Sequence, residues 1–327
     1  MTASVMCLGE CLVDRLFELG ESPHSSSNSG TDYPGGAPAN VAAAIAKLGT
    51  PTRLVSCLGQ DDLGDWLLQV LQAQGVDCQI QRVTQVPTRT VLVQRDASGD
   101  RQFIGFSDPD ATAFADAYLA PAWIDTLDFA GVDCLVMGTL GLAYPTTAKA
   151  MARAQEKVQV AGGKLVIDLN WRPVFWPEVA LAAAKIRPFL ATADLLKLSR
   201  EEALWLLDTD SAIEICQQFP RCQAVLLTDG GNGSICATKH HTVALPAFEV
   251  ASIDTTGAGD AFLAGVIHQL QQWSWDDLQD PAQAKGILRY ASAVGALTTL
   301  KPGAIAAQPT PEEVAAFLAQ PGVGTSA

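Results

Sequence analysis

The order of hydrophobic and polar stretches along the chain predicts strands and helices that follow one another in turn. Short apolar runs bounded by turn-forming residues are typical of buried strands, and they occupy residues 5–9, 52–59, 133–138, 164–170, 194–199 and 223–230. Amphipathic or Ala-rich stretches predict helices within 35–49, 62–75, 146–160, 178–190 and from Arg200 onward. This alternation indicates a mostly parallel sheet with helices on both faces.

Residues 88–106 depart from this alternation. The segments TRTVLVQRD and RQFIGF flank the turn ASGD and alternate apolar with polar positions, which predicts a β-hairpin. A hairpin inside a series of strands and helices suggests a lid or an edge appendage. The Ser-rich segment 22–30 is expected to be turn-rich. Two short strands, at 234–238 and 242–246, and helices at about 258–272, at 282–300 and from Pro311 complete the chain.

Composition and charge narrow the class of protein. The 327 residues are 48% hydrophobic, enough to bury a large core, and we find neither an internal repeat nor a linker. With 21 Lys and Arg against 35 Asp and Glu, the net charge is −14, which repels nucleic acid and anionic membrane surfaces. Any phosphate must therefore be held by local groups. The sequence predicts no nucleic-acid or membrane partner.

The lack of a recognisable targeting signal and the distribution of cysteines together predict a cytoplasmic protein. The N-terminal apolar run lacks a basic region and is interrupted by Glu10 and Asp14, and no stretch of about 18 uncharged apolar residues occurs. The eight cysteines are scattered without a CxxC pair, so we expect reduced thiols. The four histidines have no ligand spacing with them, and zinc is not expected.

The segment DTTGAGDAFLAGVIHQL at 254–270 carries the sharpest chemical signal. A loop with two glycines runs into a helix with an apolar face, so the backbone N–H groups of Gly257, Ala258 and Gly259 can point at one anion. Asp260, in the first helical turn, places a carboxylate beside this anion hole. For phosphoryl transfer, the N–H groups would stabilise the transferring oxygens and the carboxylate would take the proton of the attacking hydroxyl.

Two segments together resemble the signatures of the PfkB (ribokinase-like) carbohydrate kinases. DTTGAGDAFLAG is similar to the second signature and GGAPANVAAAIAKLG, at 35–49, to the first. The resemblance continues through GECLVD, LLKLSREE and LLTDGGNGS and covers essentially the whole chain. It implies a three-layer αβα fold with a mostly parallel sheet and a small β-hairpin lid. Residues 1–327 would form one kinase domain, with lid segments at about 12–34 and 86–110.

The resemblance also implies the contacts of the sugar. These fall on Asp14, Gly35, Gly36, Ala37 and Asn40, where a carboxylate and an amide suit a polyol and glycines allow close backbone approach. The stretch DLNWRPVFW is similar to the DPNWR segment of fructokinases and 2-keto-3-deoxygluconate kinases, with Leu169 replacing proline. It adds two residues that could reach substrate and phosphate, Asn170 and Arg172.

Nucleotide and metal contacts are implied in the same way. Lys197, Thr228, Gly230 and Gly233 match family positions along ATP, and Glu202 matches the Glu that orders Mg²⁺ through water. Ser199 stands where many relatives have Asn. Relatives also hold a monovalent cation through main-chain carbonyls, so K⁺ would fall at the positions matching Asp254, Thr256 and Gly303.

The substrate is the most open point. GGAPANVA, NWR and KxS favour ATP-dependent phosphorylation of D-fructose to fructose 6-phosphate, although SDPDAT at 107–112 departs from the RxPxAD run of many fructokinases. A 2-keto-3-deoxygluconate kinase is the alternative, since its carboxylate substrate would suit Arg89, Arg95 and Arg101 in or beside the hairpin. A catalytically silent sugar-binding or regulatory subunit and a Rossmann dehydrogenase are weaker alternatives, because GAGD and Glu202 are present and no GxGxxG follows the first strand. A homodimer could pair through the lid.

Overall fold

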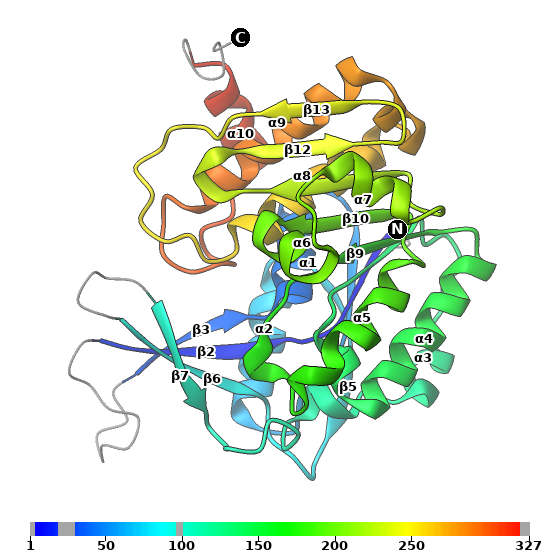
Figure 1. Cartoon of the computed structure of the whole chain (residues 1–327). Coiled ribbons are helices and arrows are strands. Elements are labelled where there is room, and N and C mark those ends of the chain that lie inside the picture. Colours follow the sequence, from blue (N-terminus) through cyan, green and yellow to red (C-terminus); the bar gives the residue numbers. More distant parts are fainter. Residues whose placement is uncertain (1–3, 19–29, 96–100, 321–327) are drawn as a thin grey trace.

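The computed structural model describes residues 4–18, 30–95 and 101–320. A nine-stranded sheet forms its centre (Figure 1). Seven neighbouring strands, from β11 to β5, run parallel, and β12 and β13 are antiparallel at one edge. In spatial order the strands are β13 (Thr242–Leu245), β12 (Ser234–Ala237), β11 (Ala224–Thr228), β10 (Leu195–Ser199), β9 (Lys164–Asp168), β8 (Cys134–Met137), β1 (Val5–Leu8), β4 (Thr52–Gly59) and β5 (Asp77–Val83).

Helices cover both faces of this sheet because its central strands are apolar on both sides. In β1, Met6 and Leu8 join one buried cluster, and Val5 and Cys7 join the other. The first cluster packs against α3 (Pro121–Thr126), α4 (Pro145–Val160), α5 (Ala182–Leu190), α6 (Arg200–Leu207) and α7 (Ala212–Gln218). The second packs against α1 (Ala37–Lys47), α2 (Asp62–Ala73), α8 (Ala258–Gln272) and α9 (Pro281–Thr298), and α10 (Pro311–Leu318) lies against α9. The predicted three-layer αβα fold is confirmed.

The lid is larger than the predicted hairpin. The hairpin itself is present as β6 (Thr90–Arg95) and β7 (Arg101–Phe106). Two further strands, β2 (Leu12–Phe17) and β3 (Thr31–Gly35), complete a separate sheet of order β3-β2-β6-β7, which projects from one end of the molecule (Figure 1). Most of the predicted Ser-rich loop at 22–30, and the predicted turn at 97–100, lie outside the described residues.

Several elements differ from the sequence prediction. Strand β5 was not predicted, because it is a half-buried edge strand whose sequence, DCQIQRV, contains no apolar run. The predicted helix at 178–190 begins only at Ala182, since Glu178 is not helical (φ −126°, ψ 79°) and 179–181 form a separate 3₁₀ turn. Helices α3 and α7, of six and seven residues, are too short for a clear periodic pattern. Within the described ranges, none of the helices has the length and apolar character needed to cross a bilayer.

Arg89 fixes the base of the lid. It lies just before β6 with a fully buried side chain, and its guanidinium makes two hydrogen bonds of 2.7 and 2.8 Å to the Asp116 carboxylate. Its Nη2 also donates to the Tyr144 hydroxyl at 3.0 Å. Phe114 and Phe175 contribute rings that lie 4.5 and 5.3 Å from the Arg89 Cζ. Arg89 therefore joins the lid to the segments that flank it and is neutralised by Asp116.

Candidate active site

The predicted anion hole falls at the N-terminus of α8, which begins at Ala258. Gly257 caps the helix with φ +78°, a left-handed conformation that favours glycine. A Cβ at this position would lie 2.6 Å from the Cβ of Ala304, so no larger residue fits. The first N–H groups of a helix have no partner within the helix, and the helix dipole adds positive potential there. An anion is therefore favoured beside Gly257, Ala258 and Gly259.

The loop that leads into this helix is held by Asp254. Its Oδ1 accepts hydrogen bonds from the Thr256 N–H at 3.0 Å and from the Thr256 hydroxyl at 2.6 Å. Its Oδ2 accepts from the Gly303 N–H at 2.8 Å. The structure thus brings together the three residues at which the resemblance implies a monovalent cation.

Asp260 makes a hydrogen bond to Asn40, a residue of the GGAPAN segment. The Asn40 Nδ2 donates to Asp260 Oδ2 at 2.8 Å, which joins α1 to the start of α8. Burial raises the pKa of Asp260, and the charge of Lys197, the Asn40 hydrogen bond and the charge of Arg172 oppose that rise. Asn40 is itself buried, and its Oδ1 has no hydrogen-bond partner among the described residues. The base and a sugar-contact residue of the prediction are therefore neighbours.

The turn before α1 packs against the end of β1 and against the lid. A Cβ on Gly35 would lie 2.5 Å from Asp14 Oδ2, so the Asp14 carboxylate lies over this glycine. Gly36 has φ +100°, and a Cβ there would lie 2.5 Å from the Glu10 carbonyl oxygen. The Ala37 N–H donates to Glu10 Oε1 at 3.1 Å. Asp14, Gly35, Gly36, Ala37 and Asn40 thus line one corner beside Asp260.

Glu10 is a buried carboxyl of this corner that sequence reasoning did not select. Burial raises the pKa of Glu10 to about 8, and the nearby charges of Asp116 and Asp260 add to the rise, whereas the Ala37 N–H opposes it. Its position directly after a buried strand, in GECLVD, is the signal that could have identified it.

Lys197 lies in the floor of the site. Its Nζ donates to Asp168 Oδ2 at 2.8 Å, and both side chains are almost fully buried. Burial acts to lower the pKa of Lys197, but the charges of Asp168, Glu202 and Asp260 outweigh this effect and raise it, so the side chain is an ammonium. A Cβ on Gly259 would lie 3.1 Å from this Nζ. Sequence reasoning selected Lys197 and missed Asp168, whose signal was its place at the end of KLVID.

Glu202 closes the floor on the side of α6. It forms a capping box with Ser199: its Oε2 accepts the Ser199 N–H at 2.7 Å, and its N–H donates to the Ser199 hydroxyl at 3.1 Å. Its Oε1 accepts the Trp171 N–H at 2.6 Å. Glu202 therefore also caps the start of α6. A carboxylate oxygen has two lone pairs, so each oxygen can still accept from a metal-bound water.

Asn170 and Arg172 follow β9 and flank Trp171. Asn170 has φ +39°, an uncommon conformation for a residue with a side chain and one that recurs at functional sites. The Arg172 side chain is exposed, and its charge lowers the pKa of Asp260. Both residues therefore follow the carboxyl end of β9, and Arg172 lies near enough to Asp260 for its charge to act on it.

The residues assigned to ATP on the remaining side follow β11. Thr228 ends this strand, and its hydroxyl donates to the Leu198 carbonyl at 3.4 Å. Gly230 and Gly233 have φ +51° and +114°, and a Cβ on Gly233 would clash with the Leu245 carbonyl. A surface hollow beside this turn is lined by residues that include Arg200, Asp229, Gly233, Ser234 and Pro246.

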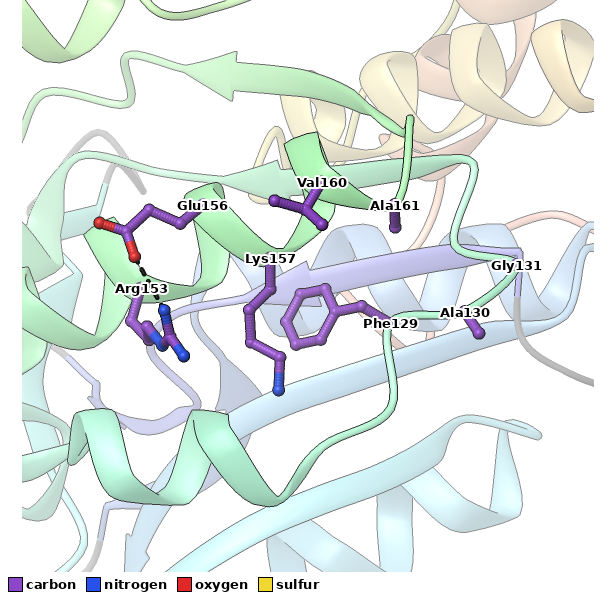
Figure 2. A pocket seen from close by; sticks show the side chains of 8 residues that line it. All are labelled: Phe129, Ala130, Gly131, Arg153, Glu156, Lys157, Val160 and Ala161. Carbon is purple, nitrogen blue, oxygen red and sulfur yellow. Dashed lines mark hydrogen bonds and ion pairs between the residues drawn. The ribbon is translucent and has the colours of Figure 1, made fainter.

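A second surface hollow lies at the amino-terminal ends of the parallel strands, before β8 (Figure 2). It is lined by the segment before β8, including Phe129 and Gly131, and by the end of α4, including Val160. The Lys157 Nζ lies 5.0 Å from the centre of the Phe129 ring and donates to three carbonyls at the end of α3. This ammonium completes a helix C-terminus, and the hollow is separate from the candidate active site.

The fold and the site together define a ribokinase-like α/β kinase: a mostly parallel sheet with a lid at one end and a glycine-cradled carboxylate at a helix start. Residues 2–311 match the family model described as pfkB family carbohydrate kinase. The chain belongs to this family.

Relatives with known names are similar over nearly their whole length. Probable fructokinase-3 of Arabidopsis thaliana is 32% identical, over 96% of this chain and 91% of the relative. A fructokinase of Xylella fastidiosa solved with ATP has a TM-score of 0.87 at 30% identity and covers 97% of this chain and 98% of that chain. A fructokinase of Vibrio cholerae, solved with fructose, ADP and calcium, has a TM-score of 0.83 at 28% identity and covers 96% and 98%. A double mutant of the latter was solved with potassium.

Proposed function

We propose that this chain transfers the γ-phosphoryl group of ATP to a hydroxyl of D-fructose and produces fructose 6-phosphate. The observation that carries the proposal is the hydrogen bond between Asn40 and Asp260. It places a sugar-contact amide against a carboxylate at an anion-binding helix start. The fructose, ADP and ATP bound to similar fructokinases support it.

In the proposed reaction Asp260 is the general base. Its ionised carboxylate accepts the proton of the attacking hydroxyl while the hydroxyl oxygen forms a bond to the γ-phosphorus. The bond from the γ-phosphorus to the bridging oxygen breaks, and ADP leaves. The N–H groups of Gly257, Ala258 and Gly259 stabilise the charge on the transferring oxygens.

Binding of the two substrates is shared between opposite sides of Asp260. On the sugar side, Asp14, Asn40, Asn170 and Arg172 offer acceptors and donors to the hydroxyl groups, and the backbone of 35–37 allows close approach. On the nucleotide side we assign ATP to Lys197, Thr228, Gly230 and Gly233.

Glu202 fits an outer-sphere role toward Mg²⁺, because both of its oxygens are already oriented by backbone N–H groups and each retains a lone pair. Bound Mg²⁺ supplies charge neutralisation at the β- and γ-phosphates. The loop of Asp254, Thr256 and Gly303 fits a K⁺ site behind the anion hole, since one carboxylate orders all three residues.

Arg89 bears on the choice between fructose and 2-keto-3-deoxygluconate. Asp116 accepts hydrogen bonds from Nε and Nη2 of Arg89 and neutralises its charge, while Nη1 is buried without a partner among the described residues. The Arg89–Asp116 pair therefore offers no net positive charge to a carboxylate substrate. The side chains of Arg95 and Arg101 lie outside the described residues. This observation favours an uncharged sugar.

We further propose that residues 1–327 form one cytoplasmic kinase domain. Its lid comprises residues at about 12–34 and 86–110. Any homodimer contact is placed at the lid, because β3 and β7 are its outer strands. Light scattering of the purified chain, with and without charged substitutions on the outer face of β7, tests this assembly.

The test of function is ADP release by the purified chain with ATP, Mg²⁺ and one acceptor at a time: fructose, ribose, 2-keto-3-deoxygluconate or adenosine. We expect fructose to give the highest kcat/KM, and enzymatic coupling to identify a 6-phosphate product. A clear preference for 2-keto-3-deoxygluconate would overturn the fructose assignment. Sugar and ATP binding without turnover would support a silent regulatory subunit instead.

A further inference from the structure

We propose that Asp168 is a positioning residue that holds the Lys197 ammonium beneath the anion hole, where it neutralises the transferring phosphoryl group. The inference rests on the proposed kinase function and adds a cationic floor to it. Three observations support it: the register of β9 and β10, the buried ion pair between Asp168 and Lys197, and the close approach of Lys197 to Gly259.

The strand register brings the two residues together. Asp168 on β9 and Lys197 on β10 are direct partners in the parallel ladder. Residues one position away, Ile167 and Leu198, belong to the core cluster on the face of α4 and α5. Because side chains alternate along a strand, Asp168 and Lys197 project to the other face, which α8 covers. The pair therefore stands under the start of α8.

The ammonium is close to the anion hole. A Cβ added to Gly259 would lie 3.1 Å from the Lys197 Nζ, tighter than most packing contacts, and 3.7 Å from its Cε, an ordinary contact. Gly259 has no need of a left-handed backbone, since it is not among the glycines with positive φ. The Lys197 ammonium therefore lies directly against Gly259 in the first turn of α8.

The pair retains unused hydrogen-bonding capacity. An ammonium has three donors, and Asp168 Oδ2 takes one of them at 2.8 Å. The second carboxylate oxygen of Asp168, Oδ1, is buried and has no hydrogen-bond partner within the described ranges. Buried ion pairs of this kind are weak contributors to stability, because apolar residues of similar volume often replace them without loss. The remaining donors of Lys197, beside an anion site, point to a role in binding negative charge.

The test compares Lys197→Met, Asp168→Asn and the double variant Asp168→Asn/Lys197→Met, with Lys157→Met, at the amino-terminal ends of the strands, as a matched control. We expect Lys197→Met to lower kcat by roughly 10²–10³-fold, the usual loss for one preorganised donor. Asp168→Asn keeps the ammonium and should lower kcat by about 10-fold, with little change in the KM for sugar. The control variant Lys157→Met should have the same kcat as the wild type.

The double variant separates positioning from structural support. Removing one partner of a buried pair leaves an uncompensated charge, so a single variant can unfold more easily, and removing both relieves this cost. We expect the double variant to melt closer to the wild type than the less stable single variant, yet to be as slow as Lys197→Met. Recovery of kcat along with stability, or an unchanged kcat in Asp168→Asn, would overturn the inference.

Nucleotide binding keeps the two proposals distinguishable. Titration calorimetry with a non-hydrolysable ATP analogue and with ADP, both with Mg²⁺, should show that Lys197→Met weakens the analogue by at least about 10-fold more than ADP, because only the analogue carries a γ-phosphate. Equal weakening of the two ligands would contradict the inference. If the wild type turns over none of the sugars, the proposed function fails, and this comparison still decides the role of Lys197.

Discussion

The Asn40 side-chain amide donates a 2.8 Å hydrogen bond to the Asp260 carboxylate, across 220 positions of sequence. This contact joins the helix that begins at the sugar-binding turn to the helix that begins at the anion hole. It also supplies one of the interactions that limit the rise in the pKa of Asp260 caused by burial. The same amide therefore affects the ionisation of Asp260 and, in the proposed function, the position of the sugar.

Loss of the Asn40 amide should move the acid limb of the pH–rate profile. A general base acts in its ionised form, and the Asn40 hydrogen bond favours that form of Asp260. In Asn40→Ala the pKa of Asp260 rises further, so higher pH is needed for the same ionised fraction. Profiles of kcat/KM for the sugar from about pH 5 to pH 9 should show a lower maximum and an acid limb displaced to higher pH. An acid limb at its wild-type position would contradict this role.

Removal of the base itself should nearly abolish turnover. Asp260→Asn retains the shape of the side chain but cannot accept the proton of the sugar hydroxyl. We expect kcat to fall by roughly 10²–10⁴-fold, the usual contribution of a positioned base. The exposed Asp276→Asn, in the acidic turn before α9, is the control and should leave kcat unchanged. Robust turnover by Asp260→Asn would remove Asp260 from its assigned role.

Gly257 should tolerate a methyl group less well than Gly75. Both have positive φ, +78° and +86°, so alanine pays a similar backbone strain of about 1 kcal/mol at each. Only Gly257 also meets Ala304, at 2.6 Å from the added Cβ, whereas nothing lies within 4 Å at Gly75. Urea unfolding should give an additional loss of about 1–3 kcal/mol in Gly257→Ala. Equal losses in the two variants would show that the contact with Ala304 relaxes freely.

Glu10 should make stability depend on pH. Burial raises its pKa in the folded protein to about 8, from an ordinary value of 4.5. The folded state therefore binds the proton more tightly than the unfolded state, so this contribution is complete below the ordinary pKa and is lost as pH rises toward about 8. Relative to Glu10→Gln, the wild type should lose up to about 1.4 kcal/mol per pH unit between about pH 5 and pH 8. Urea unfolding at both pH values measures it. A constant difference between the two proteins would contradict the assignment.

The sequence predicts the fold well where local pattern and burial agree. The apolar run KLVID and the amphipathic stretch of α8 are found as predicted, because burial on both faces or on one face leaves a strong periodic signal. β2 and β3 lie within the lid segment expected at about 12–34 but were not predicted as strands. Asp14 and Arg15 interrupt the alternation of LVDRLF, and the Arg15–Asp32 ion pair that links the two strands at 2.6 Å is visible only in three dimensions.

The site is predictable only in part for a related reason. Asp260 and Asn40 could be selected because each lies in a motif with local meaning. Asp168 has only its place at the end of KLVID as a signal, since its importance comes from Lys197 on the neighbouring strand, and strand order is not written in local sequence. The detailed role of Glu202 shows the same limit. Its bond to the Trp171 N–H joins two segments 31 positions apart.

The placement of β1 has a consequence for the order of folding. This first strand lies between β4 and β8, and its partner Cys134 is about 130 positions away. Contacts of such separation form late, because a long loop must close before they contribute. The pair Asn40 and Asp260 is more distant still. A chain emerging from the ribosome therefore contains the sugar-binding turn long before its base, and phosphoryl transfer begins only when nearly the whole sequence has been synthesised.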